Sequence, residues 1–146
     1  MRGEKIYEGD LVMTGVTDYG VSMDDILTGK KAVPLQGARF DLHVDGPCRG
    51  RLSGRMHGTD YLRMRADGHI DLDLHVIIET HDGHRIALSG GGQAAPRNGE
   101  TMIDIFANIR LTTASNEYAW VNERQIWSLS AGDLATGKIH VEAYRQ

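Results

Sequence analysis

The sequence is short of several residue types, and each shortage excludes a class of protein. It contains one cysteine, Cys48, among 146 residues, so no disulfide bond can form within the chain. It has only three prolines, which together with its frequent alternation favours many short strands. No apolar run approaches the roughly 20 residues that a membrane-spanning helix needs. The segment Met1 to Lys5 lacks the apolar core of a signal peptide. We therefore expect a soluble, cytoplasmic protein with no membrane partner.

The chain also has no excess of positive charge. Its 16 lysines and arginines are scattered among 20 aspartates and glutamates, and the formal net charge is −4. Because nucleic-acid-binding domains usually carry a basic patch, we expect no nucleic-acid partner. The run Gly90–Gly92 lacks the Lys-Ser/Thr of a phosphate-binding loop, and the chain contains no Gly-x-Ser-x-Gly element. Neither a nucleotide-binding protein nor a serine hydrolase is supported.

Glycine, in contrast, is abundant, with 18 of 146 residues against an average of about 7%. Two glycines follow aspartate, in the pairs Asp67-Gly68 and Asp82-Gly83. An Asp-Gly pair between alternating runs is a strong hairpin signal, because a tight primed turn needs positive φ at its centre. These turns predict a three-strand meander with strands at Tyr61–Ala66, His69–Thr80 and His84–Ser89.

Alternation of polar and apolar residues predicts further strands along the chain. The clearest case is Met102–Thr113, in which every second residue from Ile103 to Leu111 is apolar. In the first segment, Tyr7 shares one side with Leu11 and Met13. Patterns of this kind, with turn signals between them, predict strands at Ile6–Gly15, Arg39–Asp45, Arg49–Met56, Met102–Thr113, Tyr118–Leu129 and Ile139–Tyr144.

Three other segments complete the expected organisation. Gly46-Pro47 is expected to end the strand that starts at Arg39, since proline cannot donate to a sheet ladder. Ser22 can cap a short helix that ends at Gly29. The run Gly90–Gly99 has the composition of a flexible loop, which serves either as a lid or as a plain connector.

About eight or nine strands and one short helix make this an all-β chain, and we expect one domain over residues 1–146. An antiparallel sheet of this size curls into a barrel or splits into a sandwich, because twist accumulates and its edges must be hidden. We predict the closed form, an antiparallel up-and-down β-barrel of the lipocalin type. The interior of such a barrel is either filled by side chains or holds one small ligand.

The strand His69–Thr80 has two faces of opposite character. Its even positions are apolar from Ile70 to Ile78, whereas its odd positions include Asp73 and His75. Two arrangements fit this pattern. Either the apolar face lines the barrel core and the polar face is solvated, or the polar face points into a cavity and the apolar face packs on another subunit. Period-two alternation is consistent with both.

In the second arrangement, a ligand could contact Asp73 and His75 together, since they lie about 7 Å apart on one face. His75 is then the candidate for proton transfer, and Asp73 the group that orients it. Asp41 and His43 repeat the spacing on another strand and supply a second candidate group. The alternative is two solvated strand faces with cross-strand ion pairs, each worth less than about 1 kcal/mol.

A metal site needs consideration, because the chain has seven histidines. A site built from His43, His75 and an aspartate would be chemically reasonable, but no ligand spacing indicates it. We therefore predict neither a metal nor a cofactor.

Three further residues have the chemistry of ligand contacts. Trp120 and Asn122 share a face of their predicted strand, and an amphipathic ring beside an amide suits an apolar pocket with a few polar anchors. Arg110 can pair with a carboxylate on a ligand, or with an acidic side chain at the surface.

An ordered set of short motifs resembles a widespread bacterial family of small uncharacterised proteins, known as a domain of unknown function. The family's pattern is Gly-x-Asp-Trp, Arg-x-Asp-Gly, Leu-Asp-x-Arg, a second Asp-Gly turn and a closing Tyr-Ala-Trp-Leu-Asn. The matching segments lie between Gly46 and Tyr144: Gly58-Thr59-Asp60-Tyr61, Arg65-x-Asp67-Gly68, Leu72-Asp73-x-His75, Thr80-His81-Asp82-Gly83-x-x-Ile86 and Tyr118-Ala119-Trp120-x-Asn122.

The resemblance implies both a fold and a set of site residues. The family is similar in fold to the allene oxide cyclase and dirigent barrels, which act on apolar or aromatic small molecules, often as oligomers. Asp60, Asp73, Trp120 and Asn122 match family positions, as do Arg65 and Asp67. Tyr61 stands where the family usually has Trp, and His75 where it usually has Arg; an imidazole can move protons near neutral pH where a guanidinium cannot.

Together these observations predict a barrel that handles a small molecule, either as a cofactor-free isomerase, cyclase or lyase or as a non-catalytic carrier or sensor. In the enzyme, Trp120 and Tyr61 would form pocket walls, and Asp60, Arg110 and Asn122 would contact the ligand. A third hypothesis is a structural oligomer with a filled barrel. The apolar strand faces make a homo-oligomer, a dimer or larger, the expected state.

Overall fold

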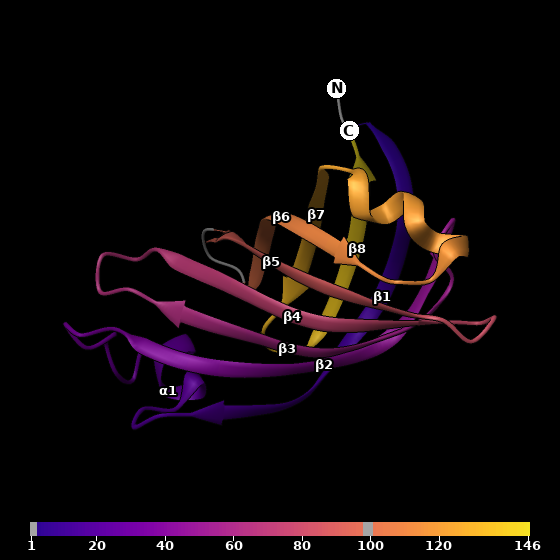
Figure 1. Ribbon diagram of the computed structural model, residues 1–146. Coiled ribbons are helices and arrows are strands. Elements are labelled where there is room, and N and C mark those ends of the chain that lie inside the picture. The colour runs from indigo at the N-terminus through magenta and orange to yellow at the C-terminus, as the bar shows by residue number, and fades with distance from the viewer. Residues whose placement is uncertain (1–2, 98–100) are drawn as a thin grey trace.

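The computed structural model describes residues 3–97 and 101–146, and its strands close into an antiparallel barrel (Figure 1). Each strand pairs with its neighbour in sequence, and the last pairs with the first, so the predicted up-and-down barrel is confirmed. The elements are β1 (Glu4–Asp18), α1 (Met23–Leu27), β2 (Ala38–Gly50), β3 (Gly54–Met64), β4 (Ile70–Thr80), β5 (Arg85–Pro96), β6 (Met102–Thr112), the 3₁₀ helix η1 (Asn116–Glu123), β7 (Ile126–Asp133) and β8 (Lys138–Arg145).

Closure occurs between β1 and β8, which pair from Glu4 opposite Arg145 to Val12 opposite Lys138. The two described ends of the chain therefore lie beside each other at one end of the barrel (Figure 1). Every strand of the barrel therefore has a neighbour on each side, although the pairing of β1 with β8 stops at Val12 while β1 continues to Asp18.

The alternating pattern determines which side chains fill the barrel. On β4, the even-numbered residues from Ile70 to Ile78 face the interior, whereas the odd-numbered residues from Asp71 to Glu79 lie on the outer wall. The first of the two arrangements considered for this strand is therefore the observed one. The same rule holds on β6, where the alternate residues from Ile103 to Leu111 face inward.

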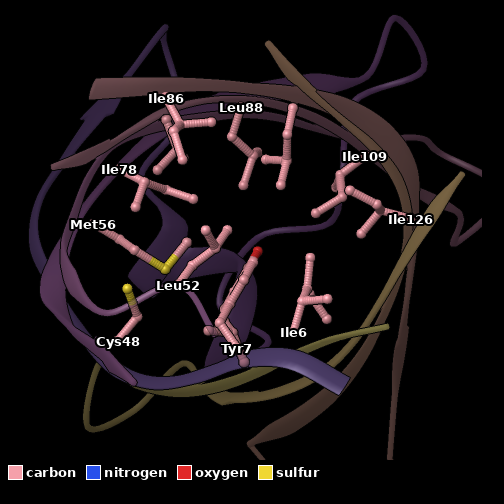
Figure 2. Packing of buried hydrophobic residues seen from close by; sticks show 14 of the residues in the cluster. Ile6, Tyr7, Cys48, Leu52, Met56, Ile78, Ile86, Leu88, Ile109 and Ile126 are labelled. Atoms are coloured by element: carbon pink, nitrogen blue, oxygen red, sulfur yellow. The ribbon is translucent and has the colours of Figure 1, made fainter. Parts of the chain in front are cut away.

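The buried side chains form two clusters inside the barrel. The first includes Ile6, Leu52 and Ile86, seen in Figure 2, and Val121 and Trp120 of η1 pack against its end. The second includes Phe40, Leu62 and Ile70, and Met23 of α1 belongs to it. The two helical segments thus cover different parts of the core.

The predicted turns and the predicted helix are found where local signals placed them. Gly68 and Gly83 have φ of 93° and 90°, but Asp67 and Asp82 do not have positive φ, so the expected primed turns are wrong. Each glycine N–H instead bonds the carbonyl oxygen three residues earlier, as in a type I turn that ends with a left-handed glycine. The Ser22 hydroxyl accepts the N–H of Asp25 at 3.1 Å and begins α1. Gly29, beyond the end of α1, has φ of 76°.

The prediction that Gly46-Pro47 ends a strand is wrong, because β2 continues to Gly50. The pairing of β1 with β2 passes from Cys48 to Asp45 without a pair at Gly46 or Pro47, so the N–H that proline lacks is not needed there. The strand predicted at Arg49–Met56 is also wrong, because Arg49 and Gly50 end β2 and β3 begins only at Gly54 after a turn. β3 then continues through Met64 and includes most of the strand predicted at Tyr61–Ala66.

Inward-facing glycines explain why β3 and β5 are longer than predicted. A Cβ atom on Gly58 would overlap the backbone oxygen of His75 on β4, and one on Gly92 would overlap the backbone oxygen of Phe106 on β6. These glycines permit close approach of two strands, and they do not mark loops. The predicted loop Gly90–Gly99 is therefore wrong as far as Pro96, which ends β5, and Asn98 and Gly99 lie outside the described residues.

The predicted strand Tyr118–Leu129 is also wrong, since its first half is the 3₁₀ helix η1. The Asn122 side chain accepts the Thr113 N–H and donates to the Thr113 carbonyl oxygen, both at 2.9 Å. This pair of bonds folds the segment back against the end of β6, so that Val121 is buried in the first core cluster. In the described part of the chain, no helix is long and apolar enough to cross a lipid bilayer.

Candidate functional site

The barrel encloses a cavity of about 80 Å³, lined by side chains from both core clusters. Most of its lining is aliphatic, from leucine, isoleucine, valine and methionine side chains. The polar members of the lining are Tyr7, Asp60, Ser128, Ser130 and Asp133. An apolar cavity with a few polar groups is the usual form of a small-molecule site.

Asp60 is the buried carboxyl of this cavity. It lies on the inward side of β3, between Gly58 and Leu62, and is 9% exposed. Its Oδ1 accepts the backbone N–H of Asp73, on β4, at 3.1 Å. Within residues 3–97 and 101–146 no lysine, arginine or histidine forms an ion pair with it.

Burial without a cation raises the pKa of Asp60 to about 7, since the core disfavours the charged form. The Asp73 N–H opposes this rise by stabilising the carboxylate, and the negative charge of Asp73 adds to it. Near neutral pH the group therefore exists in both protonation states, and it can donate or accept a proton.

Tyr7 places a second polar group in the cavity. Its side chain is 2% exposed and reaches toward the middle of the barrel, with the hydroxyl at its tip (Figure 2). No side chain or backbone group of the described residues forms a hydrogen bond with that hydroxyl. Burial raises the pKa of Tyr7 well above its usual range, so the hydroxyl stays neutral and available as a donor. On β7, Ser128 and Ser130 hydrogen-bond to each other at 3.1 Å.

Asp73 and His75 do contact each other, but on the outer wall of the barrel. His75 Nε2 lies 2.9 Å from Asp73 Oδ1, and the two side chains are 56% and 62% exposed. The His75 ring meets the Tyr61 ring edge to face, with 5.4 Å between centroids. The arrangement in which this polar face points into a cavity is therefore wrong.

Asp41 and His43 also face outward, on β2. Asp41 accepts the Tyr19 hydroxyl at 2.6 Å and the Arg39 Nε–H at 2.8 Å. These donors, Arg39 first, hold the pKa of Asp41 below its usual range. His43 lies between Thr17 and Thr59, at 3.3 and 3.0 Å from their hydroxyl oxygens.

The remaining predicted ligand residues also lie outside the cavity. Tyr61 is on the outer wall with the Arg39 guanidinium 5.1 Å from its ring centroid. Trp120 lies under the Arg51 guanidinium, 3.9 Å away, and packs on the first core cluster. Asn122 holds η1 to the end of β6, and Arg110 is exposed on the outer face of β6. Of the residues predicted as site residues, Asp60 lines the cavity and the others do not.

Sequence reasoning missed the other polar residues of the cavity. Tyr7 has the same parity as Leu11 and Met13, so the alternation of β1 already pointed it inward. Ser128 and Ser130 gave the opposite signal, because the bulky Trp127 and Leu129 between them occupy the outer face.

Two groups of described side chains lie close enough together to hold a metal ion: Glu8, His140 and Glu142, and Asp82, His84 and Glu117. Neither includes His43 or His75, the pair considered from the sequence. Both groups are at the surface, and their members also contact residues outside the groups: His140 Nδ1, for example, lies 2.8 Å from Asp10 Oδ1.

Comparison with known families and structures gives the fold a wider context. A family model described as "Protein of unknown function (DUF3237)" matches residues 21–145. No protein with a curated description matches the chain.

Solved structures of bacterial proteins share the fold. A beta-barrel-like protein from Acinetobacter baumannii AYE is 18% identical, with a TM-score of 0.77 over 97% of this chain and 93% of its own. A protein of unknown function from Clostridium acetobutylicum is 16% identical, with a TM-score of 0.79 over 100% and 99%. A conserved protein of unknown function from Rhodopseudomonas palustris is 19% identical, with a TM-score of 0.75 over 97% and 95%. The resemblance to an uncharacterised bacterial family is confirmed.

Proposed function

The chain belongs to the DUF3237 family of proteins of unknown function, and we propose that it binds a small, uncharged, largely aliphatic molecule inside the barrel and exchanges a proton with it through Asp60. One observation carries this proposal: a carboxyl group with a pKa of about 7 lies in an apolar cavity without a cation beside it. Burying a carboxyl group in an apolar cavity costs stability, and carboxyl groups with strongly raised pKa values cluster at functional sites.

The size and lining of the cavity support a small neutral ligand. A volume of about 80 Å³ is below the roughly 150 Å³ of an engineered cavity that holds benzene. The aliphatic walls would disfavour a charged molecule, whereas the Tyr7 hydroxyl can bind one oxygen atom. A short ketone, aldehyde or alcohol has this combination of features.

The chemistry of Asp60 and Tyr7 supports a proton shift. The Asp60 carboxylate removes a proton from the carbon beside a carbonyl, and the Tyr7 hydroxyl donates a hydrogen bond to the oxygen on which negative charge develops. The same carboxyl then returns the proton to a different carbon. The net reaction is an isomerisation that consumes no cofactor.

A test uses 2-butanone as the probe, since it is small, neutral and exchanges the hydrogens beside its carbonyl slowly in water. We expect the protein to accelerate deuterium incorporation into 2-butanone in deuterium oxide, measured by proton NMR. Asp60→Asn should reduce the protein-dependent rate at least about 10-fold, whereas Asp41→Asn, on the outer wall, should leave it unchanged.

The same experiment separates the alternatives. Equal rates for the wild type and Asp60→Asn would contradict the proton-transfer role. Binding of 2-butanone without exchange, with NMR shifts at cavity residues such as Leu88 and Ile109, would indicate a carrier. Shifts restricted to the outer wall would show that the cavity is not the binding site.

A further inference from the structure

A second hollow lies on the outer wall and differs from the interior cavity in its volume and in the polarity of its lining. Its volume is about 770 Å³, and it opens between the outer face of β5 and β6 and the segment that joins η1 to β7. Polar side chains dominate its lining: Ser89, Asn108, Arg110, Asn122, Glu123, Arg124 and Gln125. Arg110 and Asn122 were both expected from the sequence to contact a ligand.

Most of the described arginines are paired with carboxylates. Among the residues described, Arg39, Arg49, Arg51, Arg55, Arg65, Arg85, Arg97 and Arg145 each form an ion pair. Arg63, Arg110 and Arg124 form none within the same part of the chain. Two of these three guanidinium groups line the outer hollow.

Neutral groups of the hollow add hydrogen-bond donors. Ser89 lies directly opposite Arg110 in the pairing of β5 with β6. The Asn108 side-chain oxygen accepts the Gln125 Nε2–H at 3.1 Å, so the amide nitrogen of Asn108 remains as its free polar end. A hydroxyl and an amide N–H beside two guanidinium groups match the oxygens of an anion.

The charge balance of the lining is positive although the whole chain is acidic. Arg110 and Arg124 contribute two positive charges and Glu123 one negative charge, which leaves +1 in a protein of net charge −4. Glu123 forms no ion pair with either arginine in the described residues. The guanidinium groups are therefore available to an external partner.

We propose that this hollow binds a small molecule that carries a carboxylate or phosphate group, held by Arg110 and Arg124. A guanidinium presents its donors as a planar fork that matches two oxygens of such a group. The guanidinium site lies on the outer side of the wall, because Arg110 is exposed while Ile109, the residue before it on β6, is buried; Ile109 contributes to the lining of both hollows. The guanidinium site therefore takes a different, charged ligand.

The test is a calorimetric titration with inorganic phosphate and, separately, with succinate, at constant ionic strength. We expect saturable binding of at least one of them with a dissociation constant of about 1 mM or tighter. Arg110→Ala and Arg124→Ala should each weaken it about 10-fold or more, as expected for loss of a charge-assisted hydrogen bond. Glu123→Gln should tighten it, because one repulsive charge is removed.

Arg63→Ala is the matched control, since Arg63 is also exposed, also without an ion pair among the described residues, and lies on β3 away from the hollow. It should leave binding unchanged, and so should Asp60→Asn. An equal loss in Arg63→Ala and Arg110→Ala would reduce the effect to overall charge and overturn the proposal, as would no saturable binding of either anion. Preference for phosphate or for succinate identifies which of the two groups the ligand carries.

Discussion

Asp41 and Asp60 are two buried carboxyls on neighbouring strands with opposite properties. They are 6% and 9% exposed, and Asp60 pairs in register with Leu42, the residue after Asp41. The pKa of Asp41 is lowered, whereas that of Asp60 is raised to about 7. The two groups lie on opposite sides of the same wall. Asp60 lies within the barrel core, whereas Asp41 lies near the surface, beneath two polar side chains.

The side chains around each carboxyl group explain the difference in pKa. Asp41 is shielded by Arg39 and Tyr19, which donate hydrogen bonds to its carboxylate and favour the charged form. Asp60 is shielded by aliphatic side chains and receives one backbone N–H, so desolvation dominates. Low exposure therefore does not determine the ionisation of a carboxyl, and only the inward group is placed to exchange protons near neutral pH.

The largest expected effect comes from moving β3 away from β4, which would destroy the environment of Asp60. We expect Gly58→Ala to destabilise the protein by about 3 kcal/mol or more, because its Cβ would overlap the backbone of β4. Gly91→Ala is the matched control: its Cβ faces outward, and the nearest atom, the Leu72 oxygen, is 3.4 Å away. Urea unfolding measures both, and equal midpoints would contradict the role given to Gly58.

The second prediction uses pH to distinguish the two carboxyls. Because the pKa of Asp60 is higher in the folded chain than in the unfolded one, the folded chain holds an extra proton between about pH 4 and pH 7. The free energy of unfolding should therefore fall as pH rises through this window, by up to about 4 kcal/mol for a shift of about three units. Asp60→Asn should remove this part of the slope in urea unfolding at pH 5 and pH 8. An unchanged slope would show that Asp60 is not buried as a neutral acid.

The third prediction concerns Arg39, which shields Asp41 and donates a hydrogen bond to it. Arg39→Gln should raise the pKa of Asp41 toward its usual value and leave that of Asp60 unchanged, as followed by carbon NMR of the two carboxyl groups. The sign of the linked stability is opposite to that for Asp60: the contribution of Asp41 is present at neutral pH and is lost as pH falls through its lowered pKa. Since Arg39 is half exposed and water screens its charge, the loss of stability at pH 7 should be small. A matching change at Asp60 would show that the wall does not separate the two groups.

The smallest effect should come from Asp73. Its backbone N–H donates a hydrogen bond to Asp60, while its side chain lies on the outer wall. Asp73→Asn keeps the backbone N–H and removes the negative charge, so the pKa of Asp60 should fall, by less than about one unit. The same carbon NMR titration measures it. A rise in that pKa would mean that the Asp73 charge does not act through the wall.

Much of the fold follows from local patterns. Alternation on β4 and β6 correctly grouped the side chains that face inward, and the Asp-Gly pairs placed two of the turns. On β1 it held from Tyr7 onward, but Ile6, which has the parity of Glu8 and Asp10, is also buried in the core, beside an irregularity in the pairing with β8 between Lys5 and Tyr7. The lengths of β3 and β5 were predicted too short at Gly58 and Gly92. Glycine occurs both in loops and in strands that must approach a neighbour closely, and the sequence alone does not separate these two roles. Only the packed barrel distinguishes the two uses.

The site was harder to predict because alternation identifies two faces and does not say which is inside. Asp73 and His75 formed the more suggestive polar row, yet the apolar residues beside them filled the core. Asp60 was named through a family resemblance, since one carboxyl among Met56, Leu62 and Met64 has no motif of its own. Its altered pKa arises from side chains that reach it from other strands, and no sequence window contains them together.

The closure of β1 against β8 has a consequence for how the chain could be rearranged. Since Glu4 and Arg145 are paired neighbours, a short peptide could join the two ends without crossing the barrel. New ends could then be opened at the exposed Asp82-Gly83 turn, and the strands would keep the same order around the circle. The order of strands around the barrel does not depend on where the chain begins, so circular permutants should reach the same native state.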